Sequence, residues 1–444
     1  MPTYLEDFPR PEDGFYVLVT GANSGLGLGI GCRLIDEFLQ TRPQSQELVL
    51  IITTRDKRKG DATIEQLQAH LQKACRQLER KVPGMSMVLQ RRVHFRQEIL
   101  DLTSLLSIQV LAKKLRDTTP KLHAVICNAG IGGWVDLYWG RAVWTVLTKA
   151  PSSLTWPTFK KSGVGWVTKP QLPAKKDGSR ADEPPLGEVF CANFFGHYML
   201  GHYLAPLLAA HSEDEQARGR LIWTSSLEGY THSLNMKDMQ SIASTEPYEA
   251  SKRLTDIMAL TSTLPSTAPS VDTYLDNITD TEKKNRPRIY LTHPGICGTS
   301  IFPLNIVLDF FMFSAFYVAR WIGSQWHPVT AYKGAVSMVW IALAKQSLLD
   351  TMEERDGLGK WGSCTDRWGE ERVERTEVEG WGFGGNLGQK MSKWYQRSPY
   401  AKDLTKENKA EFVKNGEVLW KEVEALRIDW EKRLEDAGVA IKMD

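Results

Sequence analysis

The chain has 444 residues, and 55 Lys and Arg residues against 53 Asp and Glu give a net charge of +2. This balance argues against a nucleic-acid partner held by bulk electrostatics, and the length allows one large α/β domain with insertions or two domains. The six cysteines include no Cys-x-x-Cys pair, which argues against a disulfide framework and a metal site and favours a reducing compartment. Because residues 1–7 contain no apolar signal core, we expect no cleaved secretion signal.

A glycine-rich turn follows the first predicted strand. Residues 15–19 form a nearly unbroken apolar run, which suits a strand buried on both faces of a parallel sheet. Gly21, Gly25 and Gly27 come next, and apolar residues at helical spacing predict a helix over about 30–38. Such glycines let backbone N–H groups approach a pyrophosphate at the positive end of a helix. Taken alone, they could equally form only a tight turn.

Strand-like and helix-like runs alternate along the next 250 residues. Strands are predicted at 48–54, 93–102, 122–128, 220–226 and 288–292, and helices at about 60–80 and from Thr103 onward. This alternation predicts an α/β protein of the Rossmann type, with a doubly wound parallel sheet between two helix layers. A nucleotide is then expected at the carboxyl ends of the strands.

Two stretches interrupt the alternation. Residues 132–187 contain six prolines with several Gly, Ser and Lys, which predicts a long surface insertion. From residue 345 the chain is charged and rich in Trp, and residues 405–436 predict a mostly polar helix. We therefore divide the chain into a Rossmann-type domain over 1–344 and a helical C-terminal extension over 345–444.

Tyr248 and Lys252 are the most informative polar pair. A spacing of four residues places both side chains on one face of a helix. A phenol titrates near pH ~10, so it serves as a proton donor and acceptor at neutral pH only if a nearby cation stabilises its phenolate. In isolation, such a pair is more often a partly buried phenol beside a lysine that extends to solvent.

Over roughly residues 13–300 the chain resembles the short-chain dehydrogenase/reductases. The residues that carry the resemblance are Thr20-Gly-x-x-x-Gly-x-Gly27, Asp101-Leu102, Asn128-Ala129-Gly130, Asn193, Ser226, Tyr248-x-x-x-Lys252 and Pro294-Gly295. These motifs together, in the right order, are far more specific than any one of them. Within that family the chain is most similar to the fungal 3-keto-steroid reductases, through Trp223-Thr-Ser-Ser226, the stretch from Lys237 to Tyr248, the long insertion and the apolar segment after Pro294-Gly295.

The resemblance implies a role for each catalytic candidate. Tyr248 would donate a proton to a ketone oxygen as hydride arrives from reduced nicotinamide, with Lys252 lowering the pKa of the phenol. Ser226 would hydrogen-bond the same oxygen, and we prefer it to Ser225 because it stands three residues before a glycine. Asn193 would hold a water in the proton relay. The structural alternatives are a buried amide bonded to backbone for Asn193 and an ordinary strand-end hydroxyl for Ser226.

The end of the second predicted strand indicates the cofactor. Enzymes of this fold that use NAD place an acid there, whereas an arginine accommodates the 2′-phosphate of NADP. Arg55 and the three basic residues at 57–59 favour NADP(H), although a shift of one residue would present Asp56 instead and leave NAD(H) open. The residues expected at the cofactor are Gly21, Asn23, Ser24, Gly25, Leu26, Gly27, Thr54, Arg55, Asp101, Asn128, Ala129, Gly130, Tyr248, Lys252, Pro294, Gly295 and Thr299.

Residues 301–322 form an apolar segment about as long as a membrane span. Asp309 and Arg320 lie inside it, and each costs roughly 2.5–3.5 kcal/mol near the centre of a membrane helix. The uncharged run between them is too short to span, and their spacing returns them to one helix face. The segment therefore predicts an amphipathic lid or interfacial helix, with a core helix as the alternative.

The resemblance also implies an activity and a location. The expected reaction is NADPH-dependent reduction of a 3-keto-sterol to the 3β-hydroxy sterol, in sterol C-4 demethylation of ergosterol biosynthesis. The expected location is peripheral, on the cytosolic face of the endoplasmic reticulum membrane or on lipid droplets, with the C-4 methyl oxidase, the C-3 dehydrogenase and the oxidosqualene cyclase as partners. Two alternatives stay open: a reductase of another lipid ketone or retinoid, and a non-catalytic membrane scaffold for sterol enzymes. A scaffold would be free to lose Tyr248 or Lys252, and both are present.

Overall fold

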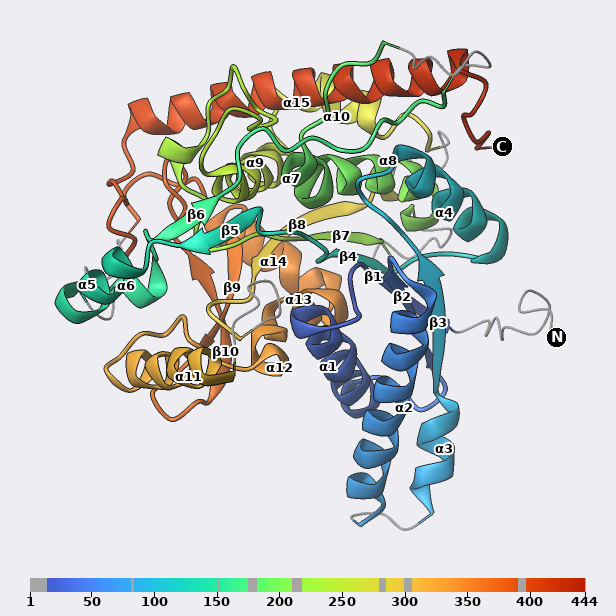
Figure 1. Cartoon of the computed structure of the whole chain (residues 1–444). Coiled ribbons are helices and arrows are strands. Elements are labelled where there is room, and N and C mark those ends of the chain that lie inside the picture. Colours follow the sequence, from blue (N-terminus) through green and yellow to red (C-terminus); the bar gives the residue numbers. More distant parts are fainter. Residues whose placement is uncertain are drawn as a thin grey trace.

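An eight-stranded sheet forms the centre of the computed structural model, which describes residues 14–80, 84–149, 152–174, 182–209, 218–278, 285–298, 306–389 and 397–443. The strand order is β10-β9-β8-β7-β4-β1-β2-β3 (Figure 1). The strands are β1 (Gly14–Val19), β2 (Glu47–Thr54), β3 (Val93–Ile99), β4 (Ala124–Cys127), β7 (Arg220–Thr224), β8 (Arg288–His293), β9 (Lys360–Thr365) and β10 (Glu371–Thr376). Neighbouring strands are parallel, except that β10 runs antiparallel to β9. The predicted Rossmann-type α/β fold is confirmed.

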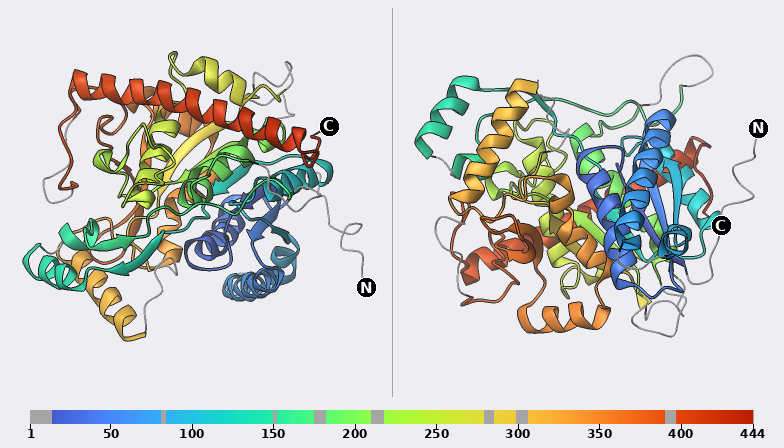
Figure 2. Two further views of the ribbon diagram at one scale, coloured as in Figure 1. Left: turned by 45° about the horizontal axis from the view of Figure 1, so that its top comes forward. Right: turned by 90° about the horizontal axis from the view of Figure 1, so that it is seen from below.

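Helices cover both faces of this sheet (Figures 1 and 2). One layer contains α4 (Leu105–Thr118), α8 (Gly196–Leu208) and α9 (Pro247–Thr261), and the other contains α1 (Gly25–Thr41), α2 (Lys57–Glu79) and α13 (Val336–Leu343). In β1, Tyr16 and Leu18 pack against the first layer, while Val17 and Val19 pack against the second. Burial on both faces explains why this strand is apolar without alternation.

Shorter elements complete the described residues. They are α3 (Met85–Arg91), α6 (Ser152–Thr155), α7 (Glu188–Phe190), the π-helix η1 (Cys191–Phe195), the 3₁₀-helix η3 (Thr231–Ser233), α10 (Ala268–Tyr274), α12 (Ala331–Gly334) and α14 (Gln346–Asp356). The predicted insertion supplies a separate two-stranded sheet of β5 (Trp134–Leu137) and β6 (Lys160–Ser162), with α5 (Trp139–Lys149) between them in the chain. This small sheet lies beside the carboxyl end of the central one (Figure 1).

The central sheet continues past residue 344, the boundary proposed from the sequence. β9 pairs in parallel with β8, and β10 closes the edge. All six residues of β9 are buried, although four are polar or glycine. Their polar groups have partners inside the protein: Lys360 binds Asp256, and Thr365 donates to the carbonyl of His327. A strand with these compensating contacts needs no apolar run, so composition alone did not predict it.

The long helix α15 (Lys406–Asp436) lies across α9 and α10 on the outside of the first helix layer (Figure 1). The predicted helix at 405–436 is confirmed. Trp420 is fully buried, and its indole Nε1 donates to the carbonyl of Met258 in α9 at 3.1 Å. The Trp420 ring also lies 5.8 Å from that of Tyr198 and 5.6 Å from that of Tyr274. These contacts fasten the carboxyl end of the chain to the helix that carries Tyr248.

The helix α11 (Ile306–Trp321) occupies the apolar segment predicted at 301–322. It lies at the same corner as α5 and α6 (Figure 2). Phe310 and Phe311 are 68% and 64% exposed, so α11 is not a core helix. Within the described ranges, no helix combines the length and the apolar character that crossing a bilayer requires.

Candidate functional site

The glycine turn between β1 and α1 is packed too closely for side chains. Gly21 and Gly25 have φ of +65° and +52°, a region that favours glycine. A Cβ at Gly27 would lie 2.2 Å from the carbonyl oxygen of Gly21, and one at Gly21 would lie 2.8 Å from Ala129 Cβ. No acidic residue occupies the first turn of α1, so its positive end suits a phosphate. With Asn23, Ser24 and Leu26 in the same turn, this geometry fits a dinucleotide.

The loop after β4 is fastened to that turn. Thr20 Oγ1 accepts hydrogen bonds from the backbone N–H groups of Asn128 and Ala129, at 2.9 and 3.0 Å. Asn128 Nδ2 donates to the carbonyl of Thr20 at 2.9 Å. A Cβ at Gly130 would lie 2.8 Å from Asn193 Oδ1. The predicted Asn-Ala-Gly motif therefore joins the glycine turn to the helix that carries Asn193.

The end of β2 presents basic rather than acidic side chains. Arg55 is exposed directly after Thr54. Asp56, which could have indicated NAD, is the N-cap of α2, and its Oδ1 accepts from the N–H of Lys59 at 2.9 Å. This carboxylate already caps a helix, and Arg55 is the exposed side chain that directly follows the strand.

The remaining cofactor candidates also follow parallel strands. Asp101 comes after β3, and its Oδ1 accepts from the backbone N–H and the hydroxyl of Thr103 at 2.9 and 2.7 Å. Pro294 and Gly295 come after β8. Thr299 lies outside the described residues. Because the carboxyl ends of parallel strands share one edge of a sheet, Asp101, Pro294 and Gly295 are brought to the edge where the glycine turn lies.

Ser226, Tyr248 and Lys252 lie together at the same edge. Ser226 follows β7, and α9 carries Tyr248 and Lys252 on one face, as their spacing predicts. Lys252 Nζ lies 5.5 Å from the centroid of the Tyr248 ring and donates to the carbonyl of Thr224 at 2.8 Å. The sheet thus positions a hydroxyl, a phenol and an ammonium beside the glycine turn.

The two serines after β7 have different surroundings. Ser225 is buried, and its Oγ donates to Asp256 Oδ1 at 2.5 Å. Ser226 Oγ accepts from the backbone N–H of Glu228 at 3.2 Å, and its hydroxyl lies close enough to Tyr248 to lower the pKa of the phenol. Ser226 is therefore the serine that can share a substrate oxygen with Tyr248.

Tyr248 is a protonated phenol at neutral pH. Burial raises its pKa and Glu228 raises it further, while Lys160 and the hydrogen bond with Ser226 lower it. The sequence predicts that Lys252 lowers this pKa. In the structure the net change in this pKa is upward, because burial and the Glu228 carboxylate outweigh Lys160, the cation that lowers it. The protonated phenol is the form that donates a proton to a ketone.

Asn193 lies in the π-helix η1, a distortion that often marks functional positions in helices. Its Oδ1 accepts from the N–H of Ile131 at 2.7 Å. Its Nδ2 donates to the carbonyl of Ile131 at 3.0 Å and to Ser251 Oγ at 3.1 Å. The side chain is thus a buried amide bonded mainly to backbone, and its part in a proton relay stays a prediction.

Activity is expected to fall as pH rises through about 8. Burial, and then the neighbouring Lys360, lower the pKa of Lys252 from 10.5 to about 8. Above that pH the ammonium loses its proton and no longer favours the phenolate that proton donation leaves on Tyr248. The measurement is the pH profile of kcat/KM for ketone reduction. Lys360→Met removes a cation beside Lys252 and should move the alkaline fall in activity to higher pH. A fall in wild-type activity only near pH 10.5 would show that the pKa of Lys252 is not lowered.

Four residues beside Tyr248 were not predicted: Trp134, Lys160, Glu228 and Glu249. The ring centroids of Trp134 and Tyr248 are 4.9 Å apart, and Lys160 Nζ lies 5.3 Å from the Tyr248 ring. Glu228 and Glu249 could have been suspected, because they stand within two residues of predicted catalytic side chains. Nothing in the sequence of the insertion marks Trp134 or Lys160.

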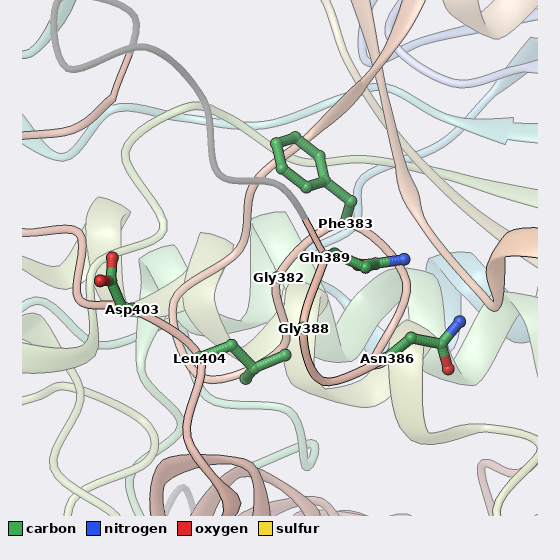
Figure 3. A pocket seen from close by; sticks show the side chains of 7 residues that line it. All are labelled: Gly382, Phe383, Asn386, Gly388, Gln389, Asp403 and Leu404. Atoms are coloured by element: carbon green, nitrogen blue, oxygen red, sulfur yellow. The ribbon is translucent and has the colours of Figure 1, made fainter.

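A separate hollow of about 200 Å³ lies between the loop after β10 and the segment before α15 (Figure 3). The residues that line it are Gly382, Phe383, Asn386, Gly388, Gln389, Asp403 and Leu404. Asp403 Oδ1 forms an ion pair with Arg397 Nη1 at 2.9 Å. None of the predicted site residues lines this hollow.

Relatives with known names match almost the whole chain. The 3-keto-steroid reductase erg27 of Aspergillus fumigatus is 43% identical over 97% of each chain, and that of Gibberella zeae is 40% identical over 95% of each. The Schizosaccharomyces pombe protein of the same name is 30% identical over 82% of this chain and 90% of its own. No family model matches.

Solved structures are more distant. Pseudomonas aeruginosa RhlG, solved as an NADP active-site complex, is 16% identical over 76% of this chain and 93% of its own, with a TM-score of 0.42. The assignment of the fold therefore depends on the strand order and the two helix layers described above. The extent and identity of the named relatives establish that this chain is an oxidoreductase that belongs to the 3-keto-steroid reductase family.

Proposed function

We propose that the protein reduces the 3-keto group of a sterol to the 3β-hydroxyl with NADPH, in sterol C-4 demethylation of ergosterol biosynthesis. The observation that carries the proposal is the protonated Tyr248 beside Ser226 and Lys252, at the sheet edge that holds the glycine turn. The names of the relatives support the substrate class. Association with the other sterol-biosynthesis enzymes stays a prediction.

In this mechanism, Tyr248 is the proton donor. The cofactor, when bound, supplies a hydride to the carbonyl carbon, and the Tyr248 O–H donates its proton to the carbonyl oxygen, where negative charge develops. The Ser226 hydroxyl donates a hydrogen bond to the same oxygen. The Lys252 ammonium favours the phenolate that remains. The hydride and the proton together convert the ketone to the alcohol.

The direct test is NADPH consumption by the purified protein with a 4-methyl-3-keto-sterol in detergent. We expect one NADPH oxidised for each ketone lost, with the 3β-alcohol as the product identified by mass spectrometry. Protein that binds NADPH but reduces only a different lipid ketone would contradict the sterol proposal. Protein that binds NADPH and reduces no ketone would favour a scaffold.

Arg55→Ala is expected to weaken NADPH binding about tenfold or more while changing NADH binding little, because a charge-assisted hydrogen bond contributes about 1.5–3 kcal/mol. Arg55 is exposed, and Asp56 is already used as a helix cap. Fluorescence titration with NADPH and with NADH measures the ratio of the two dissociation constants. Arg91→Ala, at an exposed arginine of α3, is the matched control. Equal losses for NADPH and NADH would argue against contact with the 2′-phosphate.

We also propose that α5, α6 and α11 form a docking corner for a membrane or lipid-droplet surface. Figure 2 shows these helices at one corner, although they are far apart in the sequence, and both segments carry exposed aromatic side chains. They are Tyr138, Trp139, Trp144, Phe310, Phe311 and Trp321. Aromatic and aliphatic side chains on exposed helices suit insertion into the headgroup region without spanning the bilayer.

Replacing Trp144, Phe310 and Phe311 together with serine is expected to lower binding to phosphatidylcholine vesicles at least about tenfold, since each large apolar side chain contributes about 1.5–3 kcal/mol when buried. Vesicle flotation measures the bound fraction. Met87→Ser is the control, because Met87 is an exposed apolar residue on α3. An unchanged bound fraction in the triple variant would exclude this corner as the membrane contact.

A further inference from the structure

A buried ion cluster lies beside Tyr248. Lys160 Nζ contacts both carboxylate oxygens of Glu228 at 2.8 Å and Glu249 Oε1 at 2.5 Å. All three side chains are about nine-tenths buried. The cluster is outside the group of residues predicted from the sequence, and the mechanism above does not use it.

The three charges come from three separate parts of the chain. Lys160 belongs to β6 in the insertion, Glu228 stands two residues after Ser226, and Glu249 is the neighbour of Tyr248 on α9. One ammonium therefore joins the segment that carries the catalytic serine to the helix that carries the phenol. The insertion, predicted as a surface excursion, reaches the reactive centre with this side chain.

The ammonium also faces the rings beside it. Lys160 Nζ lies 4.4 Å from the centroid of Trp134 and 5.3 Å from that of Tyr248. The charged groups around Tyr248 are Lys160 on β6, Glu228 in the loop after β7, and Glu249 and Lys252 on α9; Asp256 on α9 and Lys360 on β9 lie around Lys252. Of these groups, Lys160 is the ion-pair partner of both Glu228 and Glu249. Among the described residues, the second oxygen of Glu249 has no hydrogen-bond partner.

We propose that Lys160 is a positioning residue for ketone reduction: its ammonium holds the Ser226 segment against α9 and balances the two buried carboxylates beside the Tyr248 phenol. This inference rests on the proposed function for its effect on turnover. Without Lys160, two buried anions would face the phenol, which makes the phenolate less favourable and a buried carboxylate costly. Without Glu228, the phenol would face one anion fewer, and the phenolate would become more favourable.

The first test is the reverse oxidation of the 3β-hydroxy sterol with NADP at neutral pH, where the phenolate is the base. A change of one pKa unit in Tyr248 changes the phenolate fraction tenfold. Lys160→Met is expected to lower kcat/KM for oxidation by about tenfold or more, and Glu228→Gln to raise it by a similar factor. The double variant should return toward the wild-type value. NADP binding should stay unchanged in all three.

A fall in kcat/KM for oxidation in Lys160→Met and a rise in Glu228→Gln cannot both come from a purely structural contact, since both substitutions break the same ion pair. If both variants lowered oxidation, or if Lys160→Met left it unchanged, the inference would be wrong. Lys161→Met, at the exposed neighbour on β6, is the matched control and should behave as wild type. Should Lys160→Met fail to fold, Glu228→Gln keeps the test decisive, because loss of oxidation in that variant alone contradicts the charge balance.

A second measurement needs no substrate. In Lys160→Met, burial without a counter-ion raises the pKa of the carboxylates above their unfolded values, so the folded state binds more protons. Stability is then kept at acid pH and lost as pH rises, and the drop in Tm relative to wild type should widen from about pH 5 to pH 8. A drop in Tm that is equal at every pH would contradict the proposal that Lys160 balances the two buried carboxylates. Wild-type protein with no sterol turnover in either direction would instead reject the proposed function, and this profile would still decide the role of Lys160.

Discussion

Tyr248→Phe is expected to lower kcat for 3-keto-sterol reduction by about 10²–10⁴-fold while NADPH binding stays unchanged. The substitution removes only the hydroxyl. The remaining ring keeps its packing 4.9 Å from Trp134 and its contacts with the ammonium groups of Lys160 and Lys252, at 5.3 and 5.5 Å. Single-turnover kinetics with saturating NADPH measure the chemical step, and fluorescence titration measures the binding of the cofactor.

The matched control for this variant is Tyr138→Phe, because Tyr138 is an exposed tyrosine at the edge of the insertion. It should reduce the ketone at the wild-type rate. A kcat near the wild-type value in Tyr248→Phe would show that another group protonates the carbonyl oxygen, and Ser226 would be the first candidate because its hydroxyl lies beside Tyr248.

Trp420→Ala is expected to cost about 3–5 kcal/mol in the free energy of unfolding, the range for a large aromatic residue removed from a core. The indole is fully buried between α15 and the helices beneath it, and its N–H satisfies the carbonyl of Met258. Its loss leaves a cavity beside Tyr198 and Tyr274 and one buried carbonyl with one partner fewer. Equilibrium unfolding in urea measures the change.

Trp368→Ala provides the comparison for Trp420. Trp368 is 79% exposed in the turn between β9 and β10, so its removal should change the free energy of unfolding by less than about 0.5 kcal/mol. If Trp420→Ala were as mild as Trp368→Ala, α15 would have to be held by its ion pairs and by the Tyr198 to Glu424 hydrogen bond instead.

The strands of the Rossmann core could be predicted from the sequence because burial on both faces leaves an apolar run. The runs predicted at 15–19 and 48–54 correspond to β1 and β2, and the predicted polar helix at 405–436 is α15. β9 could not be found in this way. The polar groups of its buried residues form hydrogen bonds and an ion pair with residues up to 134 positions away, and no local sequence pattern predicts such contacts.

Those residues of the candidate site that directly follow a strand could be predicted from the sequence. Motifs after parallel strands must meet at one edge of the sheet, and Ser226 after β7 and Asn128 after β4 lie at that edge. Lys160 follows no strand of the central sheet. Its position depends on how the insertion folds back, and that depends on tertiary contacts such as those with Glu228 and Glu249. The role of Asp56 as a helix cap depends on where α2 begins, which residue spacing alone does not fix.

The packing of the last part of the chain against the reactive centre sets an order of events during synthesis. Lys360 of β9 donates to the carbonyl of Ser226 and to Asp256 at 2.5 and 2.7 Å, and α15 covers the outer face of α9. A ribosome adds about 5–20 residues per second, and amino-terminal units fold first. The nucleotide-binding half can therefore be complete while the apolar surface of α9 that receives Trp420 still faces solvent. The contacts of Lys360 with Ser226 and Asp256, and that of Trp420 with Met258, can form only after β9 and α15 have been synthesised.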